Sequence, residues 1–277
     1  MVRFHVKKGD ESQFLYDCSV NASVEDIIKE ITIIYNGRLK VSRICYEIEE
    51  LAKHGTMLPH NMMGLTDEQI EELKLTDEWG DKCTPMGGWT FNKDVIGRRN
   101  GKQPKENMQN VLKKAVNETR EMISKKLIQE DKLVTQKTVQ DALDILRGAV
   151  TIVYPMGLPP HDLINEEFQN NEDLSGTQAS LEVHNFPIKR VVSIKTGHRK
   201  SGRVMDVQLA QLWFSGKEML PKHFVKEYTG PNEKTKAIIK LQKRGSGQPC
   251  REPLMSEEER KQLMLHAYRR QEELKVG

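Results

Sequence analysis

The sequence VRFHVKKGDESQFLYDCSVNASVEDIIKEITIIY, residues 2–35, contains two strand patterns followed by a helix pattern. Residues 2–6 alternate between apolar and polar side chains, which is the period of a half-buried strand. Residues 8–11 contain a glycine and two acidic residues, a composition typical of a turn. A second apolar run follows at 14–18, so the segment predicts a hairpin.

An amphipathic helix is predicted directly after the hairpin. Ser23 is a good cap for it, and the isoleucines that follow share one face up to Tyr35. Asn36-Gly37 is expected to end this helix, and a second helix is expected at 39–54, with Gly55 as its terminator. A hairpin followed by an amphipathic helix is how ubiquitin-like β-grasp domains begin. We therefore predict the α+β class with a β-grasp module at the N-terminus.

The middle of the chain is predicted to be mainly helical. Apolar spacing indicates a long helix at 108–123 and another at 139–146. The latter leads into RGAVTIVYPMGLPPHD, residues 147–162, whose β-branched first half predicts a buried core strand at 149–154. The prolines that follow predict a stiff loop. Thr66 and Gln69 form a capping-box pair ahead of a short acidic helix.

The last third is predicted to be helical and more loosely packed. Helices are expected at 207–220, at 232–244 and from Ser256 onward, where Glu259 completes a capping pair. The predicted division of the chain is a β-grasp-like domain, a mixed helical region, a basic flexible insertion and a helical C-terminal region. Their boundaries are 1–95, 96–183, 184–206 and 207–277.

Charge is unevenly distributed. The chain has 43 basic and 40 acidic residues, a net charge of +3. The segment from His184 to Met205 contains Lys and Arg but no Asp or Glu, and the rest of the chain carries more acidic than basic residues. A nucleic-acid footprint over the whole surface is therefore not expected.

The four cysteines are scattered and form no CxxC pair, so neither a metal finger nor a disulfide framework is predicted. Charged residues occupy the N-terminus where the apolar core of a secretory signal would lie, which favours a reducing, cytosolic location. Residues 148–161 are uncharged, but they are too short to cross a bilayer, so no membrane association is expected.

Two glycine-containing loops invite comparison with a phosphate loop. Residues 97–102 read GRRNGK, but only three residues separate the glycines and Gln103 follows the lysine. Residues 197–203 have the right glycine spacing but end in Arg203 instead of lysine. Solvated basic turns are the simpler interpretation of both. Trp79 and Trp89 flank a glycine-rich stretch and are expected to be core anchors.

Long stretches of the chain resemble the Kurly family of cilia- and flagella-associated proteins. They are HVKKGDESQFL (5–15), YNGRLKV (35–41), GLTDEQIEELKLTDEWGDKC (64–83), IGRRNGKQP (96–104), VQDALDILRGAVTIVYPMGLPPHD (139–162), NEDLSGTQA (171–179), NEKTKAIIKLQKRG (232–245) and REPLMSEEERKQLMLHAYRRQEELK (251–275). The runs are long, in order and cover most of the chain.

The resemblance implies a non-enzymatic role in motile cilia: outer dynein arm assembly, and polarised positioning of the ciliary base. The implied partners are dynein-arm assembly co-chaperones of the MYND zinc-finger type and axonemal dynein chains. The implied locations are the cytoplasm, the basal body of the cytoskeleton, and the cilium. It implies no catalytic, cofactor-binding or metal-binding residue.

Two departures from the family pattern accompany this resemblance. Residues 184–207 intervene before the AQLW motif, which suggests a variant insertion, and the chain stops at Gly277 where relatives continue into an acidic and aromatic-basic tail.

Two other functions stay open. One is a microtubule- or nucleic-acid-binding module that uses the basic segment 189–203. The other is a nucleotide-binding enzyme that uses the Gly97 loop.

Overall fold

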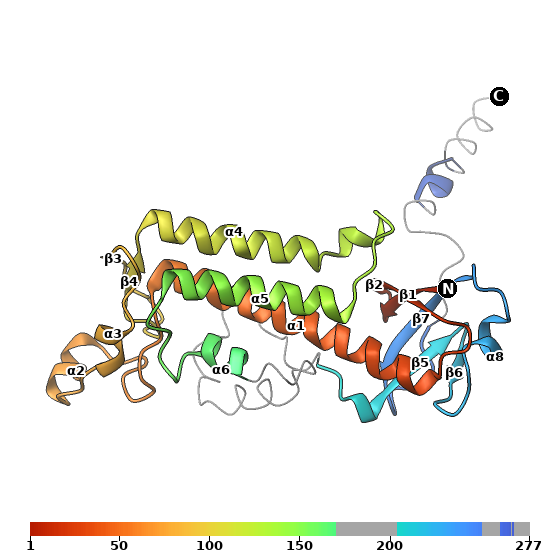
Figure 1. The fold of residues 1–277 in the computed structure, drawn as a ribbon, viewed down its shortest axis with the longest axis horizontal. Helices are drawn as coiled ribbons and strands as arrows, with labels where there is room; N and C mark the ends of the chain where they lie inside the picture. Colours follow the sequence, from red (N-terminus) through yellow and green to blue (C-terminus); the bar gives the residue numbers. More distant parts are fainter. Residues whose placement is uncertain (170–203, 251–260, 267, 269–277) are drawn as a thin grey trace.

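A computed structural model describes residues 1–169, 204–250, 261–266 and 268. A five-stranded sheet lies at one end, a layer of three long helices extends from it, and short elements gather at the far end (Figure 1). The long helices are α1 (Val24–His54), α4 (Glu106–Met122) and α5 (Gln136–Val153). This arrangement confirms the predicted α+β class.

The predicted N-terminal hairpin is confirmed as β1 (Val2–Lys8) and β2 (Glu11–Cys18). Three later strands complete its sheet: β5 (Ala210–Phe214), β6 (Lys217–Met219) and β7 (Lys236–Lys243). The strand order is β2-β1-β7-β5-β6, and β1 and β7 run parallel. The N-terminal hairpin is therefore completed by strands from the last third of the chain. The ubiquitin-like likeness and the domain boundaries stay predictions.

The predicted helix break at Asn36-Gly37 is wrong, because α1 runs unbroken for 31 residues from its Ser23 cap to Gly55. Asn36 is fully buried, and its side-chain amide donates to the Met205 carbonyl oxygen at 2.6 Å and accepts from the Met205 amide at 2.9 Å. Gly37 packs directly against Val139 of α5. Tertiary contacts thus hold both residues within the helix, and they override the local sequence pattern that predicted a helix end.

The predicted core strand at 149–154 is also wrong, because α5 continues through it to Val153. The buried residues of α5 recur at intervals of three and four positions, with two adjacent pairs among them, and form a single helical face. They are Val139, Ala142, Leu143, Leu146, Ala149, Val150 and Val153. Val150 and Val153 of the β-branched run belong to that face, which packs against α1 and α4, whereas Thr151 and Ile152 are exposed. Burial on a helix has overridden its strand propensity.

The helices predicted at 207–220 and 232–244 are wrong, because these segments form a 3₁₀ turn, η4 (Val207–Leu209), and the strands β5, β6 and β7. Ser215 and Gly216 both have positive φ angles, 48° and 81°, as the tight turn of a β5–β6 hairpin requires. In β7, Ala237, Ile239 and Leu241 are buried alternately. The regular structure of the region predicted to be helical, 207–277, is therefore mainly sheet up to residue 243.

The other predicted helices are present. The Thr66–Gln69 capping box begins α2, and residues 261–266 of the predicted last helix are helical. The capping pair Ser256–Glu259 and residues 184–203 of the basic insertion predicted at 184–206 lie outside the described residues. The remaining elements are α2 (Asp67–Glu72), α3 (Glu78–Lys82), β3 (Trp89–Phe91), β4 (Lys102–Pro104), η1 (Lys125–Ile128), α6 (Leu163–Gln169) and α8 (Lys226–Thr229). Among the described helices, none is long and apolar enough to cross a bilayer.

Candidate functional site

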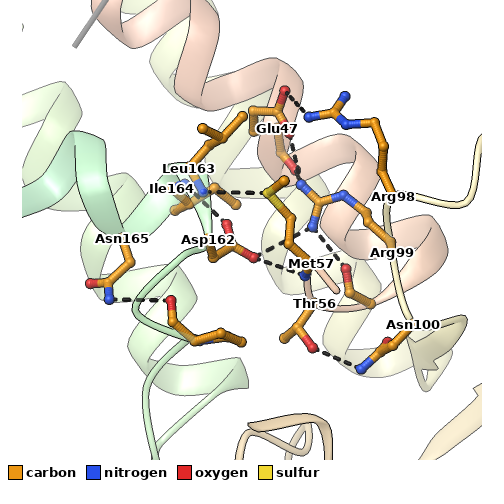
Figure 2. A network of polar contacts seen from close by, with 12 residues as sticks. Glu47, Thr56, Met57, Arg98, Arg99, Asn100, Asp162, Leu163, Ile164 and Asn165 are labelled. Carbon is orange, nitrogen blue, oxygen red and sulfur yellow. Dashed lines mark hydrogen bonds and ion pairs between the residues drawn. The ribbon is translucent and has the colours of Figure 1, made fainter. Parts of the chain in front are cut away.

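A buried ionic network joins three loops at the end of the helical layer that lies away from the sheet (Figure 2). Its centre is Arg99, whose side chain is 2% exposed. Arg99 Nη2 donates to Glu47 Oε2 at 2.8 Å, and Arg99 Nη1 donates to the Gly55 carbonyl oxygen at 2.8 Å. Nη1 also lies 3.7 Å from Asp162 Oδ2. A buried guanidinium is thus matched by two carboxylates.

Asp162 connects the network to the segment before α6. Its side chain is fully buried, and it accepts hydrogen bonds from the amides of Met57 at 3.2 Å and Ile164 at 3.0 Å. It comes directly after the proline-rich loop, so its position depends on that loop. Because Met57 follows the end of α1, Asp162 ties α1, the Arg99 loop and α6 into one unit (Figure 2).

The Arg99 loop does not have the geometry of a phosphate cradle. The carboxylate of Asp94 accepts hydrogen bonds from the backbone amides of Ile96, Arg98 and Arg99 at 2.9 to 3.0 Å. Lys102 Nζ donates to the Gly80 carbonyl oxygen and to Asp81, both at 2.8 Å. Protein groups therefore occupy the donors that a nucleotide would need. The expectation of a solvated turn is also wrong for Arg99, which is buried.

The three buried thiols show no sign of activation. Burial raises the pKa of Cys18 to about 12, and it also raises the pKa of Cys45 and Cys83. A nucleophilic cysteine needs the opposite shift. Across residues 1–169, 204–250, 261–266 and 268, no three His, Cys, Asp or Glu side chains come together in a group that could hold a metal ion.

The expectation that Trp79 and Trp89 are core anchors is wrong. Trp79 is 38% exposed and Trp89 is 44% exposed, and both lie among the short elements at the far end of the molecule (Figure 1). Each ring carries a cation: Lys82 Nζ lies 5.2 Å from the Trp79 centroid, and Lys102 Nζ lies 5.6 Å from the Trp89 centroid. Phe91, two residues along β3, is 68% exposed.

Further apolar side chains are exposed at this end. Met86 is exposed, and its amide donates to the Val153 carbonyl oxygen at 2.8 Å, which brings it to the end of α5 where Ile152 and Met156 are exposed. We call this set the aromatic end. Its members are Trp79, Met86, Trp89, Phe91, Val95, Ile96, Ile152 and Met156.

The ionic network supports the aromatic end. Asn100 Nδ2 donates to Thr56 Oγ1 at 2.8 Å, and the Gly101 amide donates to the His54 carbonyl oxygen at 2.9 Å. These bonds fix the start of β4 to the end of α1, and β4 pairs with β3. The exposed rings therefore stand on a base that is hydrogen-bonded to the helical layer. Such an arrangement can bind another protein without reorganising.

Sequence reasoning found both tryptophans but not their exposure, and it missed Asp94 and Asp162 altogether. Asp94 lies two residues before Ile96, a spacing at which an aspartate commonly bonds the backbone of its own turn. That local signal could have been read. Asp162 had no local signal, because its partners lie far away in the sequence.

Comparison with known proteins identifies the family. A family model described as cilia- and flagella-associated protein 298 matches residues 210–276, which include β5, β6 and β7. The protein of that name from Rattus norvegicus is 56% identical over 261 residues, which are 94% of this chain and 83% of the rat protein. This chain belongs to the family of cilia- and flagella-associated protein 298.

The family extends across animals. The protein from Drosophila melanogaster is 49% identical over 275 residues, 99% of this chain and 87% of the fly protein. The Homo sapiens protein is 54% identical over 256 residues, 92% of this chain and 81% of its own length. No solved structure matches this chain.

Proposed function

We propose that this chain is a non-enzymatic factor of motile cilia that acts in outer dynein arm assembly. Its relatives are named as cilia- and flagella-associated proteins, which supports a cilium-related role. The finer role is cytoplasmic preassembly of dynein arms together with co-chaperones of the MYND zinc-finger type, with axonemal dynein chains as clients. A contribution to polarised positioning of the ciliary base, at the basal body, belongs to the same proposal.

The aromatic end is the observation that carries this proposal. Exposed apolar side chains that are gathered in one place usually mark a protein-binding surface. Tryptophan is enriched among residues that dominate binding energy, and here two tryptophans and Phe91 are exposed together on hydrogen-bonded supports. The lysines over the rings favour a partner that carries acidic groups beside its apolar ones.

The polar chemistry of the same region supports a binding role over a catalytic one. The cations that could act on a substrate, Arg99 and Lys102, are bonded to protein carboxylates and carbonyl oxygens. The buried thiols have raised pKa values, which suppress the reactive thiolate. This region can present an apolar surface to a partner, while its charged groups are held in contacts within the protein.

Affinity capture from cells that are building motile cilia tests the proposal. The double variant Trp89→Ala/Phe91→Ala is compared with the wild type, using quantitative mass spectrometry of captured proteins. Phe224→Ala is the matched control, because Phe224 is 45% exposed and carries Lys226 Nζ at 5.4 Å, yet lies near the sheet. The double variant should lose dynein chains and co-chaperones while the control retains them. Equal recovery by all three proteins would refute the proposed surface.

A further inference from the structure

The strand β3, which carries Trp89 and Phe91, has a neighbouring strand on one side only. In the part of the chain that the structure describes, β3 pairs with β4 and with no other strand, and β4 packs against α1. All three residues of β3 are exposed, and the strand lies at the end of the molecule away from the five-stranded sheet (Figure 1). The edge of β3 that faces away from β4 is therefore accessible to a partner.

The pairing of β3 with β4 shows which backbone groups lie on this accessible edge. The Asn92 amide donates to the Gly101 carbonyl oxygen at 2.8 Å, so the backbone at 92 faces β4. Backbone groups alternate in direction along a strand, so those of Trp89 and Phe91 face away from β4. Pro104 lies opposite Trp89 and has no N–H to donate, which agrees with this alternation.

The side chains of Trp89 and Phe91 share one face of β3, and contacts within the protein hold both rings. The Phe91 ring lies over Gly101, where an added Cβ would be 2.8 Å from Phe91 Cε2. Lys102 Nζ lies 5.6 Å from the centroid of the Trp89 ring and is itself bonded to the Gly80 carbonyl oxygen. A strand that is already ordered loses little conformational freedom when a partner binds.

The accessible edge lacks most of the features that keep strand edges from pairing. Natural proteins protect such edges with charged side chains, prolines, bulges or very short strands. β3 is short, but its sequence Trp-Thr-Phe contains no charge and no proline, and its register with β4 has no shift. Aromatic and β-branched residues also favour the extended conformation. An edge of this kind can take up a further strand through its backbone groups.

Two lysines beside β3 have no carboxylate bonded to them among the described residues. Lys105 extends along the backbone at the start of β3, where a Cβ added to Gly88 would lie 3.5 Å from its Cε. Lys82 lies on α3, over the ring of Trp79. Both lysines are exposed, so a partner can reach them.

The acidic side chains of the same region are bonded or favourably placed within the protein. Asp81 pairs with Lys102, and the carboxylate of Asp94 accepts hydrogen bonds from three backbone amides. Glu78 and Glu106 lie in the first turns of α3 and α4, where the positive end of the helix dipole favours negative charge. Lys82 and Lys105 are thus the charges that a partner with acidic groups would complement.

We propose that a partner protein adds an acidic, extended segment to β3 as a third strand, antiparallel to it. This inference rests on the proposed function, because it states how a partner engages the aromatic end. In an antiparallel pair, the residues opposite Trp89 and Phe91 exchange backbone hydrogen bonds with them and place their side chains on the same face. Apolar side chains are expected at those positions, and acidic side chains are expected to alternate with them.

A short, end-blocked peptide of alternating glutamate and valine is the probe, because strand addition depends on the backbone more than on a particular sequence. It is titrated into the purified full-length protein and followed by NMR. The wild type should bind it saturably, and the amides of Trp89 and Phe91 should exchange with solvent more slowly in the complex. Trp89→Ala/Phe91→Ala should lose binding and Phe224→Ala should keep it. Absence of saturable binding to the wild type would overturn the proposal.

Two N-methylated forms of the peptide distinguish strand addition from contact through side chains alone. N-methylation of the valines removes the N–H groups that face β3, and it should weaken binding at least about tenfold because two hydrogen bonds are lost. N-methylation of the glutamates changes the far edge and should have little effect. Equal binding of the two forms would overturn strand addition. The proposed function would then stand, since the aromatic end would still bind through its side chains.

A peptide with lysine in place of glutamate tests the charge of the partner. It should bind more weakly than the glutamate peptide, and Lys105→Gln should reduce the difference between them. Lys113→Gln is the control, since Lys113 is exposed on α4 and bonds only Gln109 among the described residues, and it should leave the difference unchanged. Equal binding of the two peptides to the wild type would overturn the acidic character of the partner.

A second copy of this chain is the alternative occupant of the edge. Sedimentation of the wild type at the concentrations of the titration should show a monomer. A dimer that Trp89→Ala/Phe91→Ala converts to monomer would show that β3 pairs with its own copy, and it would overturn the assignment of the edge to a partner protein.

Discussion

Arg99 Nη1 lies 3.7 Å from Asp162 Oδ2, and both side chains are almost completely withdrawn from solvent. Arg99 lies before α4 and Asp162 lies before α6, so their contact joins two segments that are far apart in the sequence. Figure 2 shows the carboxylate between this guanidinium and the Met57 amide. Through this pair, the end of α1 and the loop that leads into β4, which supports the aromatic end, hold each other in position.

Asp162→Ala should destabilise the fold by about 3 kcal/mol, because it leaves a buried guanidinium with one carboxylate instead of two. The amides of Met57 and Ile164 also lose their acceptor. Denaturant unfolding gives the free energy of unfolding directly. Asp81→Ala is the control: Asp81 pairs with Lys102 but is 90% exposed, so its loss should hardly move the midpoint. Equal effects of the two substitutions would contradict a structural role for the buried network.

Gly37→Ala should destabilise the protein by about 1 to 2 kcal/mol, since overpacking exceeds the gain in helix propensity. A Cβ at position 37 would lie 2.6 Å from Val139 Cγ1. Adding Val139→Ala should relieve the overlap and recover part of the loss.

Gly148→Ala is the matched comparison, because a Cβ there has no neighbour within 4 Å among the described residues. It should stabilise α5 by about 0.5 to 1 kcal/mol. Thermal melts of the two variants measure whether Gly37→Ala lowers the melting temperature and Gly148→Ala raises it. A stabilising Gly37→Ala would show that α1 and α5 are not in close contact.

A thiol reagent at mildly alkaline pH should label Cys250 quickly, because it is the exposed cysteine. Cys18, Cys45 and Cys83 are buried and have raised pKa values, so they should react only after unfolding. Mass spectrometry of the labelled protein identifies the site, and Cys250→Ser should abolish the fast phase. Fast labelling of a second cysteine would contradict the described core.

The same shifts fix the sign of a pH effect. In the unfolded chain the Cys18 thiol loses its proton near pH 9, whereas in the fold it keeps the proton until about pH 12. The unfolded state therefore binds fewer protons in this window, and stability should fall as the pH rises from 9 to 12. Cys18→Ala should make the unfolding midpoint less sensitive to pH in that range.

Local patterns predicted the elements whose neighbours are close in sequence. The β1–β2 hairpin, the Ser23 cap and the Thr66 capping box all followed from residues within one or two turns of chain. Asn36-Gly37 was misread because the partners that hold it in a helix, Met205 and Val139, lie far away. The strands β5 and β7 were misread as helices because Trp213 and Ile238 fill outward positions and conceal the alternation.

The candidate site was less predictable than the fold. Exposure of Trp79 and Trp89 depends on which surface the short elements turn outward, and composition says nothing about that. The sequence of the Arg99 loop predicted a basic turn. The carboxylates that pair with the buried Arg99 come from α1 and from the segment before α6, so the loop's own sequence does not contain them. Tertiary placement, which no short window of sequence contains, decides both features.

The most direct test of the central claim is rescue of ciliated cells from which this protein has been removed, in which the account predicts that outer dynein arms are missing. Wild type, Trp89→Ala/Phe91→Ala and Phe224→Ala are expressed at equal levels, and outer arms are counted by electron tomography of axonemes. The account predicts that the wild type and Phe224→Ala restore the arms and that the double variant does not, although it folds normally. Full restoration by the double variant would contradict a role for the aromatic end in arm assembly.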